Sequence, residues 1–168
     1  MKIELIEVGS DELPVLRRLM QLYLYEIYSF GGWDIENDGT YGNPDWLEDL
    51  LTNTARQRYL IKVDGKLAGL ALTRSGTYFS GDDAKEISDF FILRKYRRQG
   101  VGKSVAARLF VGFAGTWEAA VLSTNIPAQH FWRAVIADYT AGRYEEFCTH
   151  YRECDFVVFR FSGREGHF

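Results

Sequence analysis

The sequence predicts a mixed α/β fold, and two observations lead to this prediction. Hydrophobic residues recur at spacings of three and four in some segments and at alternate positions in others, which is typical of amphipathic helices and of strands. Clusters of glycine, proline, asparagine and aspartate separate these segments. The predicted order is β-α-α-β-β-β-α-β-α-β-β. A chain of 168 residues, 46% of them hydrophobic, is long enough for one packed domain and marginal for two. We therefore predict a single domain over residues 1–168.

The first part of the chain predicts one strand and two helices. Residues 3–8 alternate apolar and acidic side chains, as a strand does. Gly9-Ser10-Asp11 ends this strand and offers an N-cap. Apolar residues at spacings of three and four then predict a helix that ends before Gly31-Gly32. Residues 31–43 form a turn-rich loop, and Asn43-Pro44 predicts the start of a second, short helix.

From residue 58 the apolar period becomes two. Residues 59–63 and 66–72 flank Asp64-Gly65, which is typical of a two-residue hairpin turn. The later elements are predicted as a strand over 85–93, a helix over 100–113, a strand over 117–123, a helix that Pro127 opens, and strands over 145–152 and 156–161.

Composition excludes several classes of protein. The chain has 20 lysines and arginines against 23 acidic residues, a net charge of −3, so we expect no nucleic-acid partner. Two cysteines and three histidines cannot build a disulfide framework or a four-ligand zinc site, so we expect no metal. Glu4 and Glu7 interrupt the apolar start that a secretion signal needs, and no apolar run is long enough to span a membrane. We expect no membrane partner and a cytoplasmic location.

The segment over residues 90–104 carries the clearest chemical signal. It reads as a buried strand, a basic turn with Gly100 and Gly102, and a helix start. A helix N-terminus presents unpaired N–H groups to an anion, and the two glycines let that anion approach the backbone. Five cations surround this turn in an acidic protein: Arg94, Lys95, Arg97, Arg98 and Lys103. The pattern indicates a bound polyanion of modest size, such as a pyrophosphate.

Two common phosphate-binding motifs do not fit this turn. A Walker loop needs a glycine where Arg97 stands, and a dinucleotide fingerprint needs a third glycine where Val105 stands. Residues 97–102, Arg-Arg-Gln-Gly-Val-Gly, do fit R/Q-x-x-G-x-G/A and resemble motif A of the GNAT superfamily of N-acetyltransferases, which bind acetyl-coenzyme A. Residues 125–132, Asn-Ile-Pro-Ala-Gln-His-Phe-Trp, are similar to motif B of the same family. The predicted element order matches as well.

The resemblance implies a fold, an activity and a set of coenzyme contacts. The fold would be a central, mostly antiparallel sheet with helices on both faces. The activity would be transfer of an acetyl group from acetyl-CoA to a primary amine of a small molecule or peptide, by direct attack in a ternary complex. The implied coenzyme-binding residues are Phe90, Phe91 and Ile92, at a bulge that pairs with pantetheine; Arg97, Arg98, Gln99, Gly100, Val101, Gly102, Lys103 and Ser104, around the pyrophosphate; and Asn125 and Phe131, along the arm. Phe131 could equally be a plain core residue.

A base must take the proton of the amine, and carboxylates are the usual bases. Glu86 and Asp89 lie on the implied coenzyme strand, and in an unbroken strand they face opposite sides, so one of them is expected to face the acceptor. Asp89 is favoured because it adjoins the bulge; ordinary solvated strand carboxylates are the alternative. Trp132 stands where motif B usually carries a tyrosine acid. Either Tyr139 or Tyr144 replaces that acid, or the thiolate leaves unassisted.

The acceptor region implied by the family is the first two helices and their loop. Acidic and aromatic side chains there suit a cationic amine, and the candidate contacts are Tyr25, Glu26, Tyr28 and Trp33. Core packing and ordinary surface are the competing interpretations. Two questions stay open at this stage. The domain could be a catalytically silent acetyl-CoA sensor, and the aromatic C-terminal strands could pair within one chain or form a homodimer.

Overall fold

The computed structural model describes residues 1–77 and 79–164. Its strands form one seven-stranded sheet in the order β1-β2-β3-β4-β5-β7-β6, and every neighbouring pair is antiparallel except β4 and β5. The strands are β1 (Ile3–Glu7), β2 (Arg56–Val63), β3 (Lys66–Thr77), β4 (Gly81–Ile92), β5 (Thr116–Leu122), β6 (Tyr144–Tyr151) and β7 (Cys154–Ser162). The helices are α1 (Leu13–Gly31), α2 (Pro44–Thr52), α3 (Val101–Val111) and α4 (Ile126–Thr140), with short 3-10 turns at Ser10–Glu12 and Arg94–Tyr96. The predicted element order and mixed, mostly antiparallel sheet are confirmed.

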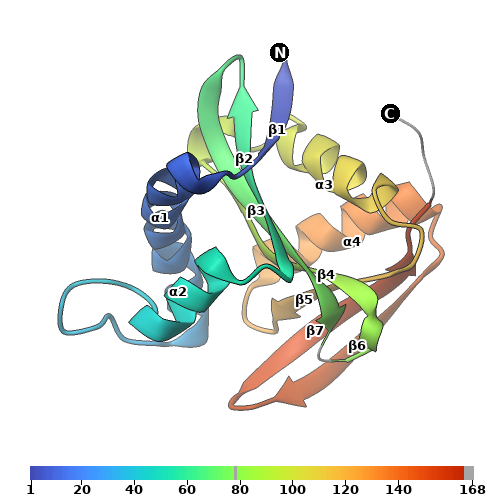
Figure 1. Cartoon of the computed structure of the whole chain (residues 1–168). Helices are drawn as coiled ribbons and strands as arrows, with labels where there is room; N and C mark the ends of the chain where they lie inside the picture. Colours follow the sequence, from blue (N-terminus) through green and yellow to red (C-terminus); the bar gives the residue numbers. More distant parts are fainter. Residues whose placement is uncertain (78, 165–168) are drawn as a thin grey trace.

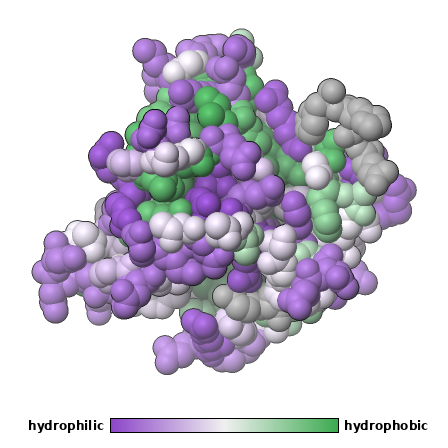
Figure 2. Space-filling model, viewed as in Figure 1, coloured by the Kyte–Doolittle hydropathy of each residue, from purple (hydrophilic) through white to green (hydrophobic). Residues whose placement is uncertain are grey.

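Helices cover both faces of the sheet. Figure 1 shows α1 and α2 on one side of the strands, and α3 and α4 on the other. Each side has its own buried cluster: leucines of α1 and α2 meet Leu70, Leu72 and Phe91, whereas α3 and α4 pack on Ala71, Trp117 and Phe159. In Figure 2 hydrophilic residues cover most of the face in view and hydrophobic ones gather in its upper part. Within the described residues, no helix is both long and apolar enough to cross a membrane.

Local signals place the helix ends as the sequence predicts. The side chain of Asn43 accepts hydrogen bonds from the backbone of Asp45 and Trp46 and so caps α2 in front of Pro44. Gly32 ends α1 in the left-handed conformation, with φ of 68°. Asp64 and Gly65 both have positive φ, as a two-residue hairpin turn requires.

The β3–β4 hairpin is longer than the sequence predicts. Beyond the predicted bounds, β3 continues to Thr77 and β4 begins at Gly81, so Arg74 pairs with Glu86 and Ser75 with Lys85. The segment is polar and rich in glycine, so alternation of apolar residues cannot reveal it. Cross-strand pairs such as Arg74 with Glu86 stabilise it instead.

Two irregularities of β4 shape the functional region. Leu72 pairs with Asp89 whereas the next residue, Thr73, pairs with Ile87, so Ser88 is an extra residue and forms a β-bulge. The bulge was expected at Phe90 to Ile92 and lies slightly before them. On its other edge, β4 pairs with β5 from Ala84 to Glu86, and no further pairs follow among the described residues. The two strands separate beyond this point.

Candidate active site

The turn between β4 and α3 presents a row of backbone N–H groups. Within the described part of the chain, no acceptor is present for the N–H groups of residues 98–103. The amide of Ser104 already donates to the carbonyl of Gly100, at 3.0 Å. Gly100 caps the helix with φ of 80°, and Arg98 has φ of 59°. Left-handed residues on either side of Gln99 curve the backbone, which is how successive N–H groups come to share one anion.

Gly102 lies where α3 meets α4. A Cβ atom added there would come within 3.0 Å of the Phe131 ring. That ring stacks on Phe90, with centroids 5.7 Å apart. Phe131 therefore packs against the helix start and against β4, and it is one of the partly buried residues on the α3–α4 core. Gly102 and Phe131, which are both predicted coenzyme contacts, therefore lie next to each other.

Glu26, a predicted acceptor contact, lies beside the turn between β4 and α3. From α1 it pairs with Arg94 at 3.0 Å and with Arg97 at 2.7 Å. Arg97 also donates through Nε to the carbonyl of Ile92, at 2.7 Å, and lies over the Phe91 ring. The ion pairs with Glu26 join α1 to the turn. The bond from Arg97 occupies the Ile92 carbonyl, one of the backbone groups predicted to pair with pantetheine.

The β5–α4 turn is held by two buried amides. Asn125 caps α4 by accepting from the backbone of Ala128 at 3.1 Å. Gln129 donates to the carbonyls of Leu122 and Ser123, at 3.2 and 2.8 Å. These bonds satisfy the carbonyls at the end of β5, where the strand has no partner in β4. Asn125 is thereby fixed at the edge of the space between the strands.

A cleft of about 840 Å³ opens where β4 and β5 separate. Its floor comes from the two strands, one wall from α1, its loop and α2, and the other from the β6–β7 hairpin. Predicted site residues that line it are Tyr28, Trp33, Glu86, Asp89, Phe90 and Asn125. Lining residues that sequence analysis did not assign to the acceptor site include Tyr23, Phe79, Tyr151, Arg152 and Phe156. Four acidic residues line the cleft, Asp34, Glu36, Glu86 and Asp89, against one basic residue, Arg152.

The bulge at Ser88 brings both candidate bases to one face of the sheet. The sequence alone predicts that Glu86 and Asp89 face opposite sides, as they would in an unbroken strand. The extra residue restores their parity, since their partners Arg74 and Leu72 share a face of β3. Both carboxylates are 7% exposed and line the cleft. The expectation that one of them faces away is therefore wrong.

Asp89 is a buried carboxylate with a raised pKa. Burial raises its pKa above the usual range, against the opposing effects of Ser88, Arg56, Arg74 and Tyr23. The Ser88 hydroxyl donates to it at 2.9 Å, and Tyr23 lines the same cleft. A carboxylate with a raised pKa can take a proton at neutral pH more readily than an ordinary aspartate.

Glu86 is an ion-pair partner. Its Oε2 lies 2.5 Å from the Arg74 guanidinium, on the neighbouring strand. Burial still raises its pKa, although Arg74 opposes this effect. Beside it on β5, the buried Glu118 pairs with Arg160 at 2.9 Å and accepts from Ser80. Glu86 would have to leave a buried pair in order to act as a base, which favours Asp89.

No tyrosine of α4 or β6 that was considered as an acid lies in the cleft. Tyr139 packs on Phe110, and its hydroxyl accepts from the backbone of Arg164. Tyr144 packs on Phe159, with centroids 6.2 Å apart. Trp132, at the position of the motif B tyrosine, is buried against Phe90 and also lines the cleft. The structure therefore brings neither proposed substitute acid to the reacting region.

The acceptor candidates separate into two pairs. Tyr28 and Trp33 meet edge to face, with centroids 5.4 Å apart, and form an aromatic corner of the cleft. Tyr25 is 61% exposed and does not line the cleft, and Glu26 lies at the coenzyme turn. On the opposite wall Phe79 meets Tyr151 at 6.0 Å. The aromatic residues of the C-terminal strands were noticed in the sequence, but their place in the cleft depends on long-range pairing.

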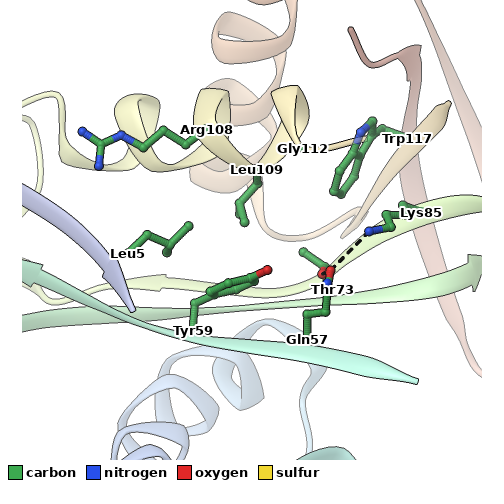
Figure 3. Close-up of a pocket in the computed structure, with 9 residues that line it drawn as sticks. All are labelled: Leu5, Gln57, Tyr59, Thr73, Lys85, Arg108, Leu109, Gly112 and Trp117. Carbon is green, nitrogen blue, oxygen red and sulfur yellow. Dashed lines mark hydrogen bonds between the residues drawn. The ribbon is translucent and has the colours of Figure 1, made fainter. Parts of the chain in front are cut away.

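A second, smaller cavity of about 330 Å³ lies on the α3 side of the sheet. Figure 3 shows Lys85 and Thr73 turned toward Gln57, with Tyr59 beside them and Arg108 directed away. Lys85 donates to Gln57 at 3.2 Å. Among the residues that the structure describes, none of the predicted site residues lines this cavity, and its charged lining residues are Lys85 and Arg108. In the described part of the chain, no group of three or more potential metal ligands occurs.

Comparison with known proteins agrees with this geometry. The family model described as "Acetyltransferase (GNAT) family" matches residues 17–135. The chain belongs to this family. It is therefore an acyltransferase that transfers acetyl groups, and the resemblance drawn from motifs A and B is confirmed. No curated protein matches the chain.

Solved structures of this family share the fold. An acetyltransferase of the GNAT family from Streptococcus agalactiae superposes with a TM-score of 0.72 at 16% identity, covering 98% of this chain and 96% of that one. An acetyltransferase from Thermus thermophilus gives 0.70 at 15%, covering 96% and 97%. Spermidine N-acetyltransferase from Vibrio cholerae, in complex with CoA and spermine, gives 0.63 at 16%, covering 96% and 95%. At these identities the likeness is one of fold.

Proposed function

We propose that this acetyltransferase moves an acetyl group from acetyl-CoA to the primary amine of a cationic small molecule or peptide, with Asp89 as the base. One observation carries the proposal. The buried Asp89 lines the same cleft as Phe90 and Asn125, two residues assigned to the coenzyme arm. An amine entering between the aromatic walls would thus meet its base and the thioester in one place.

The turn between β4 and α3 fits a pyrophosphate. The N–H groups of residues 98–103 lack internal acceptors among the described residues, and Gly100 leaves open space above the backbone. Arg98 and the helix dipole add positive charge there, whereas Lys103 pairs with Asp138 of α4, at 2.9 Å. These groups would bind and orient the coenzyme, while Asn125 and Phe90 would border its arm.

The reaction needs a free amine and a leaving thiolate. Asp89 takes one proton from the acceptor ammonium, and the nitrogen attacks the thioester carbonyl. A carbon–nitrogen bond replaces the carbon–sulfur bond, and the nitrogen releases its second proton to solvent to give the neutral amide. The coenzyme leaves as a thiolate, whose pKa is near 8.5 in free thiols, so departure without an acid is feasible at neutral pH. Asp89 then returns its proton to solvent. Glu86 lies on the same strand, where burial raises its pKa and the ion pair with Arg74 opposes that rise.

The cleft favours a cation. Acidic side chains exceed basic ones along it, and Tyr28 and Trp33 offer ring faces for cation–π contact. The structural relative from Vibrio cholerae binds spermine, a polycationic amine, so polyamines belong in any panel of trial acceptors. Other members of the panel are an aminoglycoside, an amino-acid amide and a peptide with a free N-terminus.

A silent acetyl-CoA sensor is the competing function, and Trp132 in place of the motif B tyrosine is the observation that favours it. Changing Glu86 and Asp89 together to amides separates the two functions. An enzyme loses turnover in this variant and keeps coenzyme affinity, whereas a sensor has no turnover to lose.

The first experiment is isothermal titration of the protein with acetyl-CoA, with ADP and NAD as controls. We expect acetyl-CoA to bind more tightly than either control. Release of free thiol is then followed with each amine of the panel. Absence of acetyl-CoA binding would overturn the proposal, and binding without thiol release from any amine would favour the sensor.

A further inference from the structure

The second cavity, on the α3 side of the sheet, has the opposite charge from the cleft. Among its described lining residues Lys85 and Arg108 are cationic and none is acidic. The cleft, by contrast, is lined by four acidic residues and one basic one. A concave surface lined by one sign of charge attracts ligands of the other sign. Within a chain whose net charge is −3, the second cavity is therefore a place suited to an anion.

Lys85 is the cation that can reach such an anion. Arg108 donates to the carbonyl of Ile3 at 2.8 Å and is directed away from the cavity (Figure 3). Lys85 is half-buried, and its Nζ donates to Gln57 at 3.2 Å and lies 5.1 Å from the centre of the Phe113 ring. Both partners are neutral, and within the described part of the chain Lys85 has no ion-pair partner. Its charge is left for a ligand.

The side-chain amide of Gln57 is oriented so that its NH₂ group stays available. Its Oε1 accepts from Lys85 and from the hydroxyl of Thr73, each at 3.2 Å. A lysine can only donate, so the atom that faces it must be the oxygen. Thr73 is 1% exposed, which fixes this contact from the floor of the cavity. Nε2 of Gln57 has no acceptor among the described residues, so the amide offers a donor beside the ammonium of Lys85.

Tyr59 adds a hydroxyl to this group of donors. Its ring lies along the cavity with the hydroxyl directed toward Thr73 (Figure 3). Burial, and after it the charge of Glu7, raises the pKa of Tyr59, so the phenol keeps its proton at neutral pH and can donate it. Glu7 is the partner of Tyr59 across β1 and β2 and is not a lining residue of the cavity.

The remaining part of the lining is apolar. Its side chains come from β1, α3 and β5: Leu5, Leu109 and Trp117. Donors on one side and apolar carbon on the other are typical of a site that orients a small molecule with one polar end. The volume of about 330 Å³ limits such a molecule to a short chain or a single ring.

We propose that this cavity binds a small carboxylate with an apolar tail. The carboxylate pairs with Lys85 and accepts hydrogen bonds from Gln57 and Tyr59, and charge-assisted bonds of this kind are the strong ones. The tail contacts Leu109 and Trp117. Lys85 and Glu86 are neighbours in β4 and face opposite sides of the sheet, so this site is separate from the cleft and does not depend on the proposed role of Asp89.

The test is an NMR titration of the protein with hexanoate, without acetyl-CoA or an amine. The backbone amides and the side-chain amide of Gln57 are followed in ¹H–¹⁵N spectra. We expect saturable shifts at Gln57, Tyr59 and Lys85, with a millimolar Kd. Hexan-1-ol, which has the same chain without the charge, should bind about tenfold more weakly or worse, and hexylamine should leave these signals unchanged.

Two variants test the assigned contacts. Lys85→Met keeps the apolar stem and removes the charge, and should weaken hexanoate binding about tenfold or more. Gln57→Glu places a carboxylate beside Lys85 and should prevent hexanoate binding, because the lysine then has an internal partner. Lys66→Met, at an exposed position of the β2–β3 hairpin, is the matched control and should bind hexanoate as the wild type does. The spectra of the free variants show that each is folded.

Several results would overturn the proposal. One is the absence of saturable shifts at the cavity, and another is equal binding of hexanoate and hexan-1-ol. Equal affinities in Lys85→Met and Lys66→Met would show that Lys85 is not the partner. Shifts confined to residues 98–104 would place the anion at the turn between β4 and α3 instead. Failure of acetyl-CoA to bind would contradict the proposed function and leave this result standing, since the titration contains neither substrate.

Discussion

Replacing Gly100 by aspartate should weaken acetyl-CoA binding through charge alone. The position has open space, and a Cβ atom built there meets no atom within 4 Å. Its φ of 80° costs any L-residue about 1 kcal/mol, and aspartate and asparagine tolerate this conformation best. Gly100→Asn therefore carries the same shape and strain without the charge, and serves as the control.

The expected loss of acetyl-CoA affinity follows from the position of Gly100 at the start of α3, within the row of free N–H groups. Two unit charges about 4 Å apart repel by about 1 kcal/mol in water and about 4 kcal/mol near a protein surface. Against the two charges of a pyrophosphate the loss is at least about 2 kcal/mol, or about 30-fold in Kd. The asparagine variant should lose far less.

Isothermal titration of both variants with acetyl-CoA at low and high salt checks this reasoning, and thermal unfolding confirms that both are folded. The gap between the variants should narrow at high salt, since exposed charges are screened. Equal affinities for the aspartate and asparagine variants would refute the assignment of the pyrophosphate to this turn.

Two further substitutions test the walls of the site. Trp33→Ala should raise the KM for a cationic acceptor about two- to fivefold and leave the Kd for acetyl-CoA unchanged, because it removes a ring from the cleft. Leu22→Ala, at a 50% exposed position of α1, is its control, and equal KM values for both variants would contradict the acceptor assignment. Gly102→Val should lower the free energy of unfolding by about 1–3 kcal/mol, since its Cβ meets the Phe131 ring; an unchanged denaturation midpoint would exclude that close packing.

Local signals were sufficient for most of the fold. The Asn43-Pro44 cap, the Asp64-Gly65 turn and the glycine turn before α3 each determine a backbone conformation within a few residues, so the sequence predicts them directly. The extension of the β3–β4 hairpin was missed because its cross-strand pairs are polar. Apolar alternation reports burial, and this hairpin is stabilised by Arg74 and Glu86 instead.

Only the part of the candidate site that depends on local sequence was predicted correctly. Asp89 and the turn at residues 97–102 follow from one continuous segment, and a motif reveals them. The face that Glu86 presents depends on the bulge at Ser88, which no alternation pattern shows. Glu26 is drawn to Arg94 and Arg97, about 70 positions along the chain, and Tyr151 reaches the cleft through the pairing of β6 and β7. The positions of Glu26 and Tyr151 depend on contacts between distant segments, so local sequence patterns do not predict them.

The role of Asp89 as a buried base has a consequence for stability, which Asp89→Asn should reveal. Burial raises the pKa of Asp89 above its value in the unfolded chain, so the folded protein retains this proton to a higher pH than the unfolded one. As the pH rises through the unfolded value near 3.9 the native state begins to lose stability, and the loss is complete above the folded pKa. Each unit of the shift is worth about 1.4 kcal/mol at neutral pH.

An asparagine has no charge to desolvate, and its carbonyl can still accept from Ser88. We therefore expect Asp89→Asn to lose turnover and yet unfold at a higher urea concentration than the wild type at pH 7.5, with the difference shrinking toward pH 4. Gain of stability with loss of activity is typical of a group kept at a functional site against the preference of the fold. If Asp89→Asn is instead less stable at pH 7.5, the hydrogen bond from Ser88 and the charges of Arg56 and Arg74 stabilise the ionised carboxylate by more than burial destabilises it. Asp89 would then be a structural ion-pair partner with a lowered pKa, and its assignment as the base would lose its physical ground.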